Sequence, residues 1–287
     1  MIVDIHTHIF PDALAHRAVN GKTEQYTLTH YSDGTEAGLR RSMREAGVTH
    51  SVLCSITVKP GQSKKTNEFA AKFLDRKAEN GTQILPFASV HPLEDDWRTT
   101  LRAVKEMGFR GIKLHPDYQN FYVDDVFMEP IYRELARLGL VVLFHAGRDI
   151  GLPGPTHATP RRFANIIDLL EPLKAVIAHM GSHEYEQDAL KYLCGRDVYF
   201  DTSYSLDRMD AGVAREIIRR HSPERMLFGS DSPWTGQKEA VGYFTKQFAP
   251  GFLSSGDMDK VLWANAADLL GLHVGIATEH IHRTEKI

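Results

Sequence analysis

The sequence predicts an α/β fold, and more narrowly a (β/α)8 (TIM) barrel. Short runs rich in β-branched and apolar residues alternate with segments of helical apolar spacing, at intervals of about 25–35 residues. Eight such pairs fit into the 287 residues of the chain, and eight βα units close into a barrel. An open doubly wound sheet is the alternative. It would place a glycine-rich nucleotide-binding turn after the first strand, and none follows Ile5.

Each predicted unit consists of a short strand and a helix. Strands are expected where a short apolar run is bounded by polar or turn residues, at 2–5, 51–56, 84–90, 111–115, 140–145, 175–179, 198–201 and 226–230. Helices are expected where apolar residues recur with helical spacing, at 36–46, 65–80, 96–107, 126–138, 160–170, 186–193, 209–221 and 236–247. A C-terminal helix is expected over 258–272, with Gly271 as its stop signal.

One connection between predicted elements is long. Residues 9–34 separate the first strand from its helix and contain the turn signals Pro11, Asn20-Gly21 and Asp33-Gly34. Loops of this length are usually functional or disordered, so a partly ordered cover over one barrel mouth is expected. No linker or repeat interrupts the chain, which predicts a single domain over residues 1–287. Residues 274–287 carry no readable pattern.

Composition narrows the classes of partner and compartment. The net charge of -3 and the pI of about 6.6 provide no basic field for nucleic acid or anionic lipid. Apolar stretches such as 140–144 are far shorter than the ~20 residues that span a bilayer. The N-terminus lacks the basic and apolar regions of a signal peptide. With only Cys54 and Cys194, a cytoplasmic protein is expected, and Cys54, inside an apolar run, is expected to be buried and inert.

Polar residues of metal-binding type end five of the predicted strands. His6 and His8 end the first, and residues two apart on a strand face the same side. Among 15 histidines one such pair is expected by chance, and a second occurs at His280 and His282. Position favours the first pair, because (β/α)8 enzymes build their sites at the C-terminal ends of the strands. The other residues at such ends are Lys113 and His115, His145, His179 and Asp231. Separate structural roles for all of them are the weaker alternative.

Five segments in order closely resemble the amidohydrolase superfamily: 4–8, 111–116, 144–147, 178–181 and 229–233. The nearest similarity is to its amidohydrolase-2 branch, which contains decarboxylases similar to aminocarboxymuconate-semialdehyde decarboxylase. Segment 263–271 is similar to the last helix of that family. The resemblance covers residues 1 to about 272. It is specific for the fold and the metal site and unspecific for the substrate.

The resemblance implies that four residues bind one divalent metal ion, most often zinc: His6, His8, His145 and Asp231. Imidazole and carboxylate ligands suit zinc, and a zinc-bound water has its pKa lowered towards ~7. Asp231 is then expected to take the proton of the attacking water. His179 is expected to polarise the substrate carbonyl or to stabilise the oxyanion.

Lys113 has two interpretations. Related two-metal amidohydrolases bridge their ions with a carboxylated lysine at the end of the fourth strand, and the order of ligand residues here matches theirs. The branch with the segment 111–116 favours one metal instead. Lys113 is then a cation for an anionic substrate, beside His115 in the pocket wall. Arg148 is expected to bind a substrate carboxylate, with a surface arginine as the alternative. Both a site role and ordinary packing are open for Asp4, His91, Tyr118, His157, His183 and Trp234.

The main functional expectation is hydrolysis, in which a zinc-activated water attacks the carbonyl carbon of a small carboxylated amide, ester or lactone. The alternative is metal-dependent nonoxidative decarboxylation of an aromatic or enoic acid, with Asp231 or His179 protonating carbon. A deoxyribonuclease of the TatD type is disfavoured, because Lys113 and His115 stand where that family has a bridging glutamate. A non-enzymatic metal-binding protein is the remaining class. A homodimer is expected from the resemblance alone.

Overall fold

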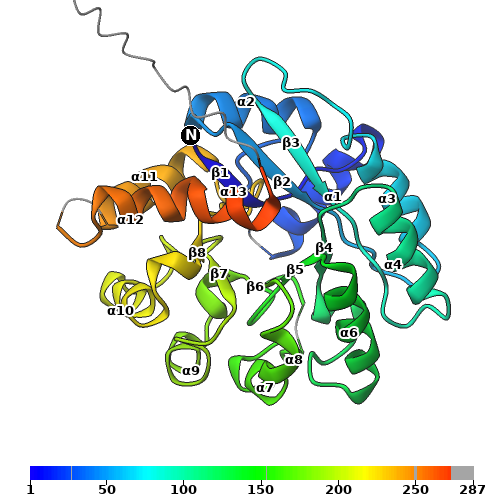
Figure 1. Ribbon diagram of the computed structural model, residues 1–287. Helices are drawn as coiled ribbons and strands as arrows, with labels where there is room; N and C mark the ends of the chain where they lie inside the picture. Colours follow the sequence, from blue (N-terminus) through cyan, green and yellow to red (C-terminus); the bar gives the residue numbers. More distant parts are fainter. Residues whose placement is uncertain (27, 153, 249–250, 273–287) are drawn as a thin grey trace, which may run out of the picture.

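The protein is a ring of strands surrounded by helices (Figure 1). Its computed structural model describes residues 1–26, 28–152, 154–248 and 251–272. The described strands are β1 (Val3–Thr7), β2 (His50–Cys54), β3 (Gln83–Phe87), β4 (Gly111–Leu114), β5 (Val141–Phe144), β6 (Ala175–Ile177), β7 (Tyr199–Asp201) and β8 (Met226–Leu227). Each overlaps one of the predicted strands. The histidine pair at 280 and 282 lies outside the described residues.

All pairings between neighbouring strands are parallel, in two runs, β1-β2-β3 and β4 to β8. Single bridges join the two runs at both seams. Ala88, just after β3, bridges to Ile112 of β4, and Thr7 of β1 bridges to Ser232 after β8. The Ile5 amide also donates to the Phe228 carbonyl oxygen at 2.9 Å. Hydrogen bonds therefore run all the way around the ring, and the predicted (β/α)8 barrel is confirmed.

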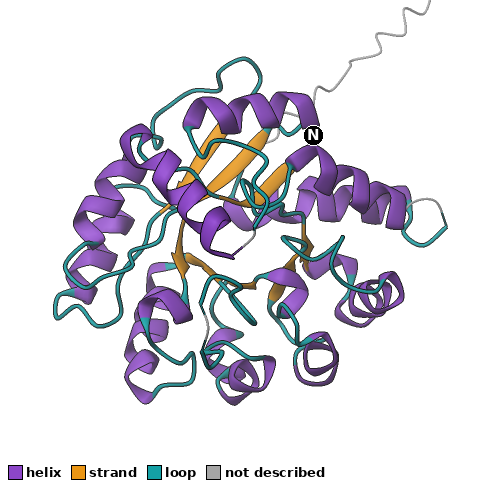
Figure 2. Ribbon diagram, turned by 180° about the vertical axis from the view of Figure 1, so that it is seen from behind, coloured by secondary structure: helices purple, strands orange, loops and turns teal. Residues whose placement is uncertain are grey.

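Helices pack around the outside of the ring, as the view from behind also shows (Figure 2). They are α2 (Glu36–Ala46), α3 (Ser63–Ala71), α4 (Trp97–Glu106), α6 (Glu129–Leu138), α7 (Pro160–Asn165), α8 (Ile167–Leu170), α9 (Glu186–Tyr192), α10 (Ala211–His221) and α11 (Gln237–Phe248). Local signals set their ends. The Thr35 side chain accepts from the Gly38 amide at the start of α2, and Gly47 ends this helix in the left-handed conformation.

Several predicted boundaries differ from the structure. The helix predicted at 65–80 ends at Ala71, and the helix predicted at 160–170 is broken at Ile166, where φ is -119°. Short helices occur at α5 (Pro116–Gln119), η1 (Val126–Met128), η2 (His179–Gly181) and η3 (Pro223–Arg225). The C-terminal helix is three consecutive pieces, α12 (Ser255–Asp259), the π-helical η4 (Lys260–Ala264) and α13 (Asn265–Leu270). Gly271 ends it in the left-handed conformation, as predicted.

The predicted long loop over residues 9–34 is wrong in one respect, because it contains the helix α1 (Asp12–Tyr26). Ala15 and Val19, one helical turn apart, are both buried and fix this helix to the barrel. The Phe10 amide donates to the Gly34 carbonyl oxygen at 2.8 Å, which ties the two ends of the segment together. Among residues 12–21, where burial is described, a stripe of two buried apolar residues was too narrow to indicate a helix from the sequence.

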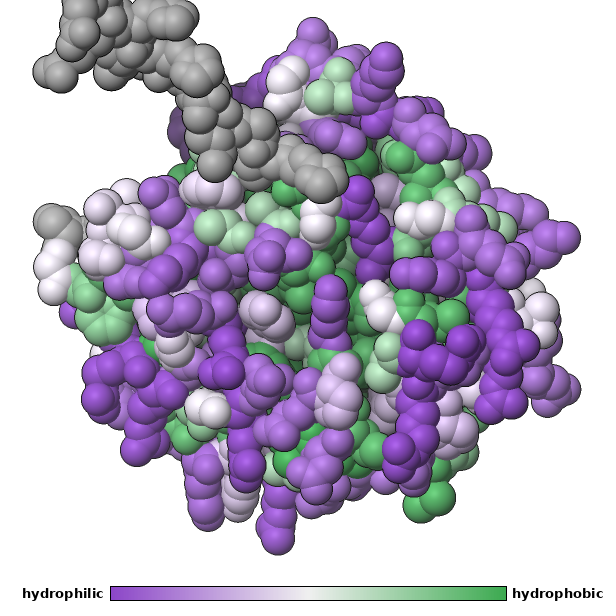
Figure 3. All heavy atoms as spheres, in the orientation of Figure 1, coloured by the Kyte–Doolittle hydropathy of each residue, from purple (hydrophilic) through white to green (hydrophobic). Residues whose placement is uncertain are grey.

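The apolar core has two layers, one inside the barrel and one between strands and helices. The inner layer includes Val3, Ile5, Cys54 and Leu227, and it continues into Leu269 of α13 at the N-terminal end of the strands (Figure 1). Cys54 is buried as expected, and burial raises the pKa of its thiol to about 12. On the face seen in Figure 1, where α13 lies, hydrophilic side chains surround the centre of the molecule (Figure 3). Among the described helices, none is long and apolar enough to cross a bilayer.

His221, at the end of α10, makes stability depend on pH. Its ring stacks on Phe200 at 3.7 Å, its Nε2 lies 2.8 Å from the Val198 carbonyl oxygen, and its Nδ1 accepts from the Gly195 amide. Burial lowers the pKa of His221 from 6.5 to about 4. Because the unfolded chain binds the proton more tightly, stability is present above pH 6.5 and is lost as the pH falls towards 4. Wild type is expected to lose about 2 kcal/mol more than His221→Gln between neutral pH and about pH 4.5.

Urea unfolding of both proteins at both pH values measures this difference. The exposed His30 provides the matched control, and His30→Gln is expected to keep the pH dependence of the wild type. Equal losses in wild type and His221→Gln would contradict the assignment.

Candidate metal centre and active site

His6 and His8 face the inside of the barrel because β1 contains a bulge. The pairing of β1 with β2 shifts between Asp4 and Thr7, so β1 has an extra residue there. Before the bulge, Ile5 belongs to the inner core, whereas Asp4 accepts a hydrogen bond from Gln237 of α11 on the outside. After it, His6 and His8 both line a cavity at the C-terminal mouth of the barrel. Asp4 therefore does not share the facing of the two histidines.

The two imidazoles meet the carboxylate of Asp231. Asp231 Oδ1 lies 3.5 Å from His6 Nε2 and 3.1 Å from His8 Nε2. The opposite nitrogens are already bound, His6 Nδ1 to Asp201 Oδ2 at 2.9 Å and His8 Nδ1 to the Cys54 carbonyl oxygen at 2.8 Å. Such bonds orient metal-binding histidines in proteins. The two nitrogens and one carboxylate oxygen form a donor set that fits a divalent metal ion.

Asp231 lies in a loop, and backbone contacts rather than a helix or strand hold it in place. Asp231 follows β8 with a φ of 67°, and its amide donates to the His6 carbonyl oxygen at 2.9 Å. Asp4 holds the same loop, because its carboxylate accepts from the Ser230 amide at 3.0 Å and from the Ser230 hydroxyl at 2.6 Å. Burial raises the pKa of Asp4 to about 6. Asp4 is thus an anchor for the loop that carries Asp231, and its carboxylate does not orient an imidazole.

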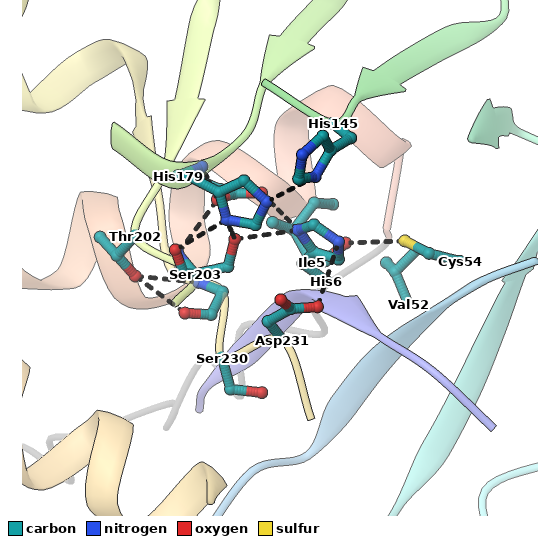
Figure 4. A network of polar contacts seen from close by, with 12 residues as sticks. Ile5, His6, Val52, Cys54, His145, His179, Thr202, Ser203, Ser230 and Asp231 are labelled. Carbon is teal, nitrogen blue, oxygen red and sulfur yellow. Dashed lines mark hydrogen bonds and ion pairs between the residues drawn. The ribbon is translucent and has the colours of Figure 1, made fainter. Parts of the chain in front are cut away.

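Asp201, the last residue of β7, and Ser203, just after it, contact the candidate site, and the sequence analysis named neither of them. Figure 4 shows Ser203 between His6 and His179. Asp201 Oδ2 accepts from His6 Nδ1, and Asp201 Oδ1 accepts from the His179 amide at 2.9 Å. The Ser203 hydroxyl lies 2.9 Å from His6 Nδ1 and 3.0 Å from His179 Nδ1. Burial raises the pKa of Asp201, but the charge and hydrogen bond of His6 outweigh it and lower the pKa to about 2. A carboxylate at the end of the seventh predicted strand was the available signal.

His145 lies outside the group formed by His6, His8 and Asp231. Its Nδ1 is 3.0 Å from His179 Nε2 (Figure 4). Its ring stacks on His115 at 4.1 Å. Its Nε2 is buried without a hydrogen-bond partner among the described residues, 4.0 Å from Asp117 Oδ2. Burial, followed by the charges of His115 and His179, holds the pKa of His145 well below its usual range. His145 and His179 therefore offer two further nitrogen donors beside the group of His6, His8 and Asp231.

Lys113 is buried in the floor of the barrel mouth. Its Nζ lies 2.9 Å from His6 Nε2, and burial lowers its pKa. Its neighbour His115 is held by Asp149, with His115 Nε2 3.1 Å from Asp149 Oδ2. Arg148 stands at the rim, with 59% of its side chain exposed and an ion pair of 3.1 Å to Glu184. The substrate-binding roles of Lys113, His115 and Arg148 stay predictions.

The residues for which both a site role and ordinary packing were open divide into two groups. His91 accepts from the Leu93 amide, and His157 Nδ1 lies 3.2 Å from the Pro116 carbonyl oxygen, which are packing roles. The others line the cavity: Tyr118, His183 and Trp234. Burial lowers the pKa of His183 to about 4.

Every residue that the sequence analysis assigned to the site lines one cavity of about 850 Å³. They are His6, His8, Lys113, His115, His145, Arg148, His179 and Asp231. Apolar side chains from α1 and α3 and from the segments before them form much of its outer wall, among them Phe10, Leu14, Ile56 and Phe69. The segment predicted as a cover thus contributes a wall of the cavity.

Comparison with known proteins agrees with this geometry. The family profile described as amidohydrolase matches residues 3–272. The chain belongs to the amidohydrolase family. This membership makes the chain an enzyme of a metal-dependent family, and His6, His8 and Asp231 form a group that could hold a metal ion. No curated protein matches the sequence.

Three solved structures show how far the similarity of this amidohydrolase chain extends. An uncharacterised TIM-barrel protein from Bordetella bronchiseptica is 21% identical, with a TM-score of 0.71 over 94% of this chain and 98% of that one. A 2,6-dihydroxybenzoate decarboxylase in complex with 2,6-dihydroxybenzoate is 18% identical, with a TM-score of 0.68 over 94% and 99%. A dihydroxybenzoic acid decarboxylase from a Polaromonas species, with bound manganese, is 18% identical, with a TM-score of 0.66 over 94% and 97%. At these identities the likeness concerns the fold.

Proposed function

We propose that this chain is a metal-dependent nonoxidative decarboxylase of an aromatic or enoic acid. The main supporting observation is that a metal-type donor set and the buried Lys113 lie together at one end of a cavity with apolar outer walls. A carboxylate can approach the polar end while an unsaturated carbon skeleton contacts the apolar walls. Two of the compared structures are decarboxylases of dihydroxybenzoates, which favours this reaction over the hydrolysis expected first.

His6, His8 and Asp231 are proposed to hold the metal ion, zinc in our expectation. A bound divalent ion would supply a Lewis acid that polarises substrate oxygen atoms. Lys113 would attract the carboxylate, because its Nζ adjoins His6 in the floor of the cavity. Hydrogen bonds with Asp201 and Ser203 hold the Nδ1 side of the His6 and His179 rings. The opposite nitrogens then lie among the cavity residues, His6 Nε2 beside Lys113 and His179 Nε2 beside His145.

His179 is the proposed proton donor to carbon. In the reaction, the bond between the carboxyl carbon and its neighbour breaks, carbon dioxide leaves, and the neighbouring carbon takes a proton from His179. Solvent then returns a proton to the imidazole. Asp231 is less suited to this step, because its carboxylate is directed at both His6 and His8.

The reaction is tested by incubating the metal-loaded protein with hydroxybenzoates and enoic acids, and in parallel with lactones, amides and esters. Loss of carbon dioxide from an acid of the first group is expected, with a rate that falls at least 100-fold, about the lower limit for a general acid, in His179→Gln. Chelation of the metal is expected to stop the release, and added zinc or manganese to restore it.

Formation of a new carboxylate from a lactone, amide or ester, without gas from any acid, would instead establish the hydrolase. Retention of the wild-type rate in His179→Gln would remove His179 as the proton donor.

A further inference from the structure

The cavity is larger than one small ring requires. Its volume of about 850 Å³ is in the range of sites that enclose drug-sized ligands. Apart from Arg148 at the rim, the polar groups proposed to act on the substrate lie at the floor. A substrate that fills the cavity must therefore continue from the floor, past the apolar walls, to the rim.

The upper walls contain apolar side chains that the protein leaves uncovered. Leu14 of α1, Val58 after β2 and Ile150 after β5 are 42%, 45% and 37% exposed. All three line the cavity, although they come from three separate segments. Exposed apolar side chains gathered around a cavity indicate a surface that a ligand covers. The middle of the substrate is therefore expected to be apolar.

Three cationic side chains line the rim of the cavity together with these apolar residues. Lys65 and Phe69 of α3 and Lys72, the residue that caps its C-terminal end, follow one another at helical spacing and all line the cavity. Arg17 lies one turn from Leu14 along α1 and lines the cavity as well. Within the described part of the chain, none of these three cations is in an ion pair, whereas Arg148 at the same rim is paired with Glu184. Glu68 is the acidic residue of α3 that lines the cavity with them. The positive rim is local, because the chain as a whole has a net charge of -3.

We propose that the substrate is an extended dianion. Its reacting carboxylate lies at the floor, its apolar middle contacts Leu14, Val58 and Phe69, and a second anionic group is held at the rim by Arg17, Lys65 and Lys72. The proposal rests on the proposed decarboxylase function for the identity of the first anion. The position of the second follows from the rim cations alone.

The test compares two unreactive ligands of equal length, para-hexylbenzoate and para-(ω-carboxypentyl)benzoate. Their dissociation constants for the metal-loaded enzyme are measured by calorimetry at low and high salt. The diacid is expected to bind about tenfold more tightly at low salt, and added salt is expected to reduce this preference. The combined variant Arg17→Gln, Lys65→Gln and Lys72→Gln is expected to bind both ligands equally.

Lys64→Gln is the matched control. Lys64 is exposed on the same helix but does not line the cavity, so this variant should keep the wild-type preference. A second variant, Lys65→Glu, is expected to weaken the diacid more than the monoacid. Equal binding of the two ligands by wild type, or a preference that survives in the combined variant, would overturn the proposal.

Because binding requires no turnover, this result is separable from the proposed reaction. A diacid preference without gas release from any acid would support the rim site and reject the decarboxylase. Gas release from small aromatic acids with equal binding of the two ligands would support the decarboxylase and reject the rim site.

Discussion

Asp231→Asn is expected to lower turnover about 10³-fold and to remove bound metal from the purified protein. Asp231 Oδ1 meets both His6 Nε2 and His8 Nε2, so the substitution removes the only charge of this donor set. Asparagine has the same shape and tolerates the left-handed conformation that Asp231 adopts at a φ of 67°. The backbone of the loop is therefore expected to persist, and the loss to be chemical. Elemental analysis, turnover and circular dichroism measure the three quantities.

The metal content of wild type also decides the number of ions. One equivalent per chain agrees with a centre of His6, His8 and Asp231. Two equivalents would support a carboxylated Lys113, with His145 and His179 as donors to the second ion. Asp168→Asn, at an exposed position of α8, is expected to match wild type. Full metal content and turnover in Asp231→Asn would show that the proposed centre is wrong.

Asp201→Asn is expected to lower metal affinity by about 10- to 100-fold, although Asp201 is not itself a proposed ligand. The wild-type carboxylate accepts from His6 Nδ1 with one oxygen and from the His179 and Ser203 amides with the other. In asparagine one oxygen becomes an NH2 donor. If that donor faces His6, the Nδ1 proton must move to Nε2, the nitrogen directed at Asp231 and the proposed metal. Competition with a chromogenic chelator measures the affinity.

Asp197→Asn provides the control for this experiment. Asp197 lies just before β7 but forms an ion pair with Arg225 on the surface, so no change in metal affinity is expected. An Asp201→Asn protein with wild-type metal affinity would show that Asp201 does not position His6. Lower turnover at unchanged affinity would point to its bond with the His179 amide alone.

Local spacing was sufficient to predict the barrel. The same unit of a buried strand followed by a helix recurs along the chain. The apolar spacing of each strand and each helix is visible in a short window of sequence. The prediction of 111–115 therefore differs little from β4, Gly111–Leu114. It failed for α1, where Ala15 and Val19 are the two buried apolar residues among 12–21, the part of this helix whose side chains are described. It also failed at the ends of helices such as α3, where helix boundaries depend on neighbouring segments.

The approximate location of the site was also predictable, because parallel strands in a barrel end at one mouth. The direction of each side chain was not. The bulge in β1 separates the facing of Asp4 from that of His6, and nothing in the alternation of residues indicates where a strand gains a residue.

The local sequence thus dictates the order of strands and helices and places histidine, lysine and aspartate at the strand ends. Tertiary structure decides which imidazole nitrogen faces which partner. His6 is oriented by Asp201, which is 195 residues away. His145, a fourth ligand in the sequence-based prediction, lies beside His179 rather than with His6, His8 and Asp231. Such contacts join separate βα units. They arise only when the ring closes, because only then do β1, β7 and β8 share one mouth.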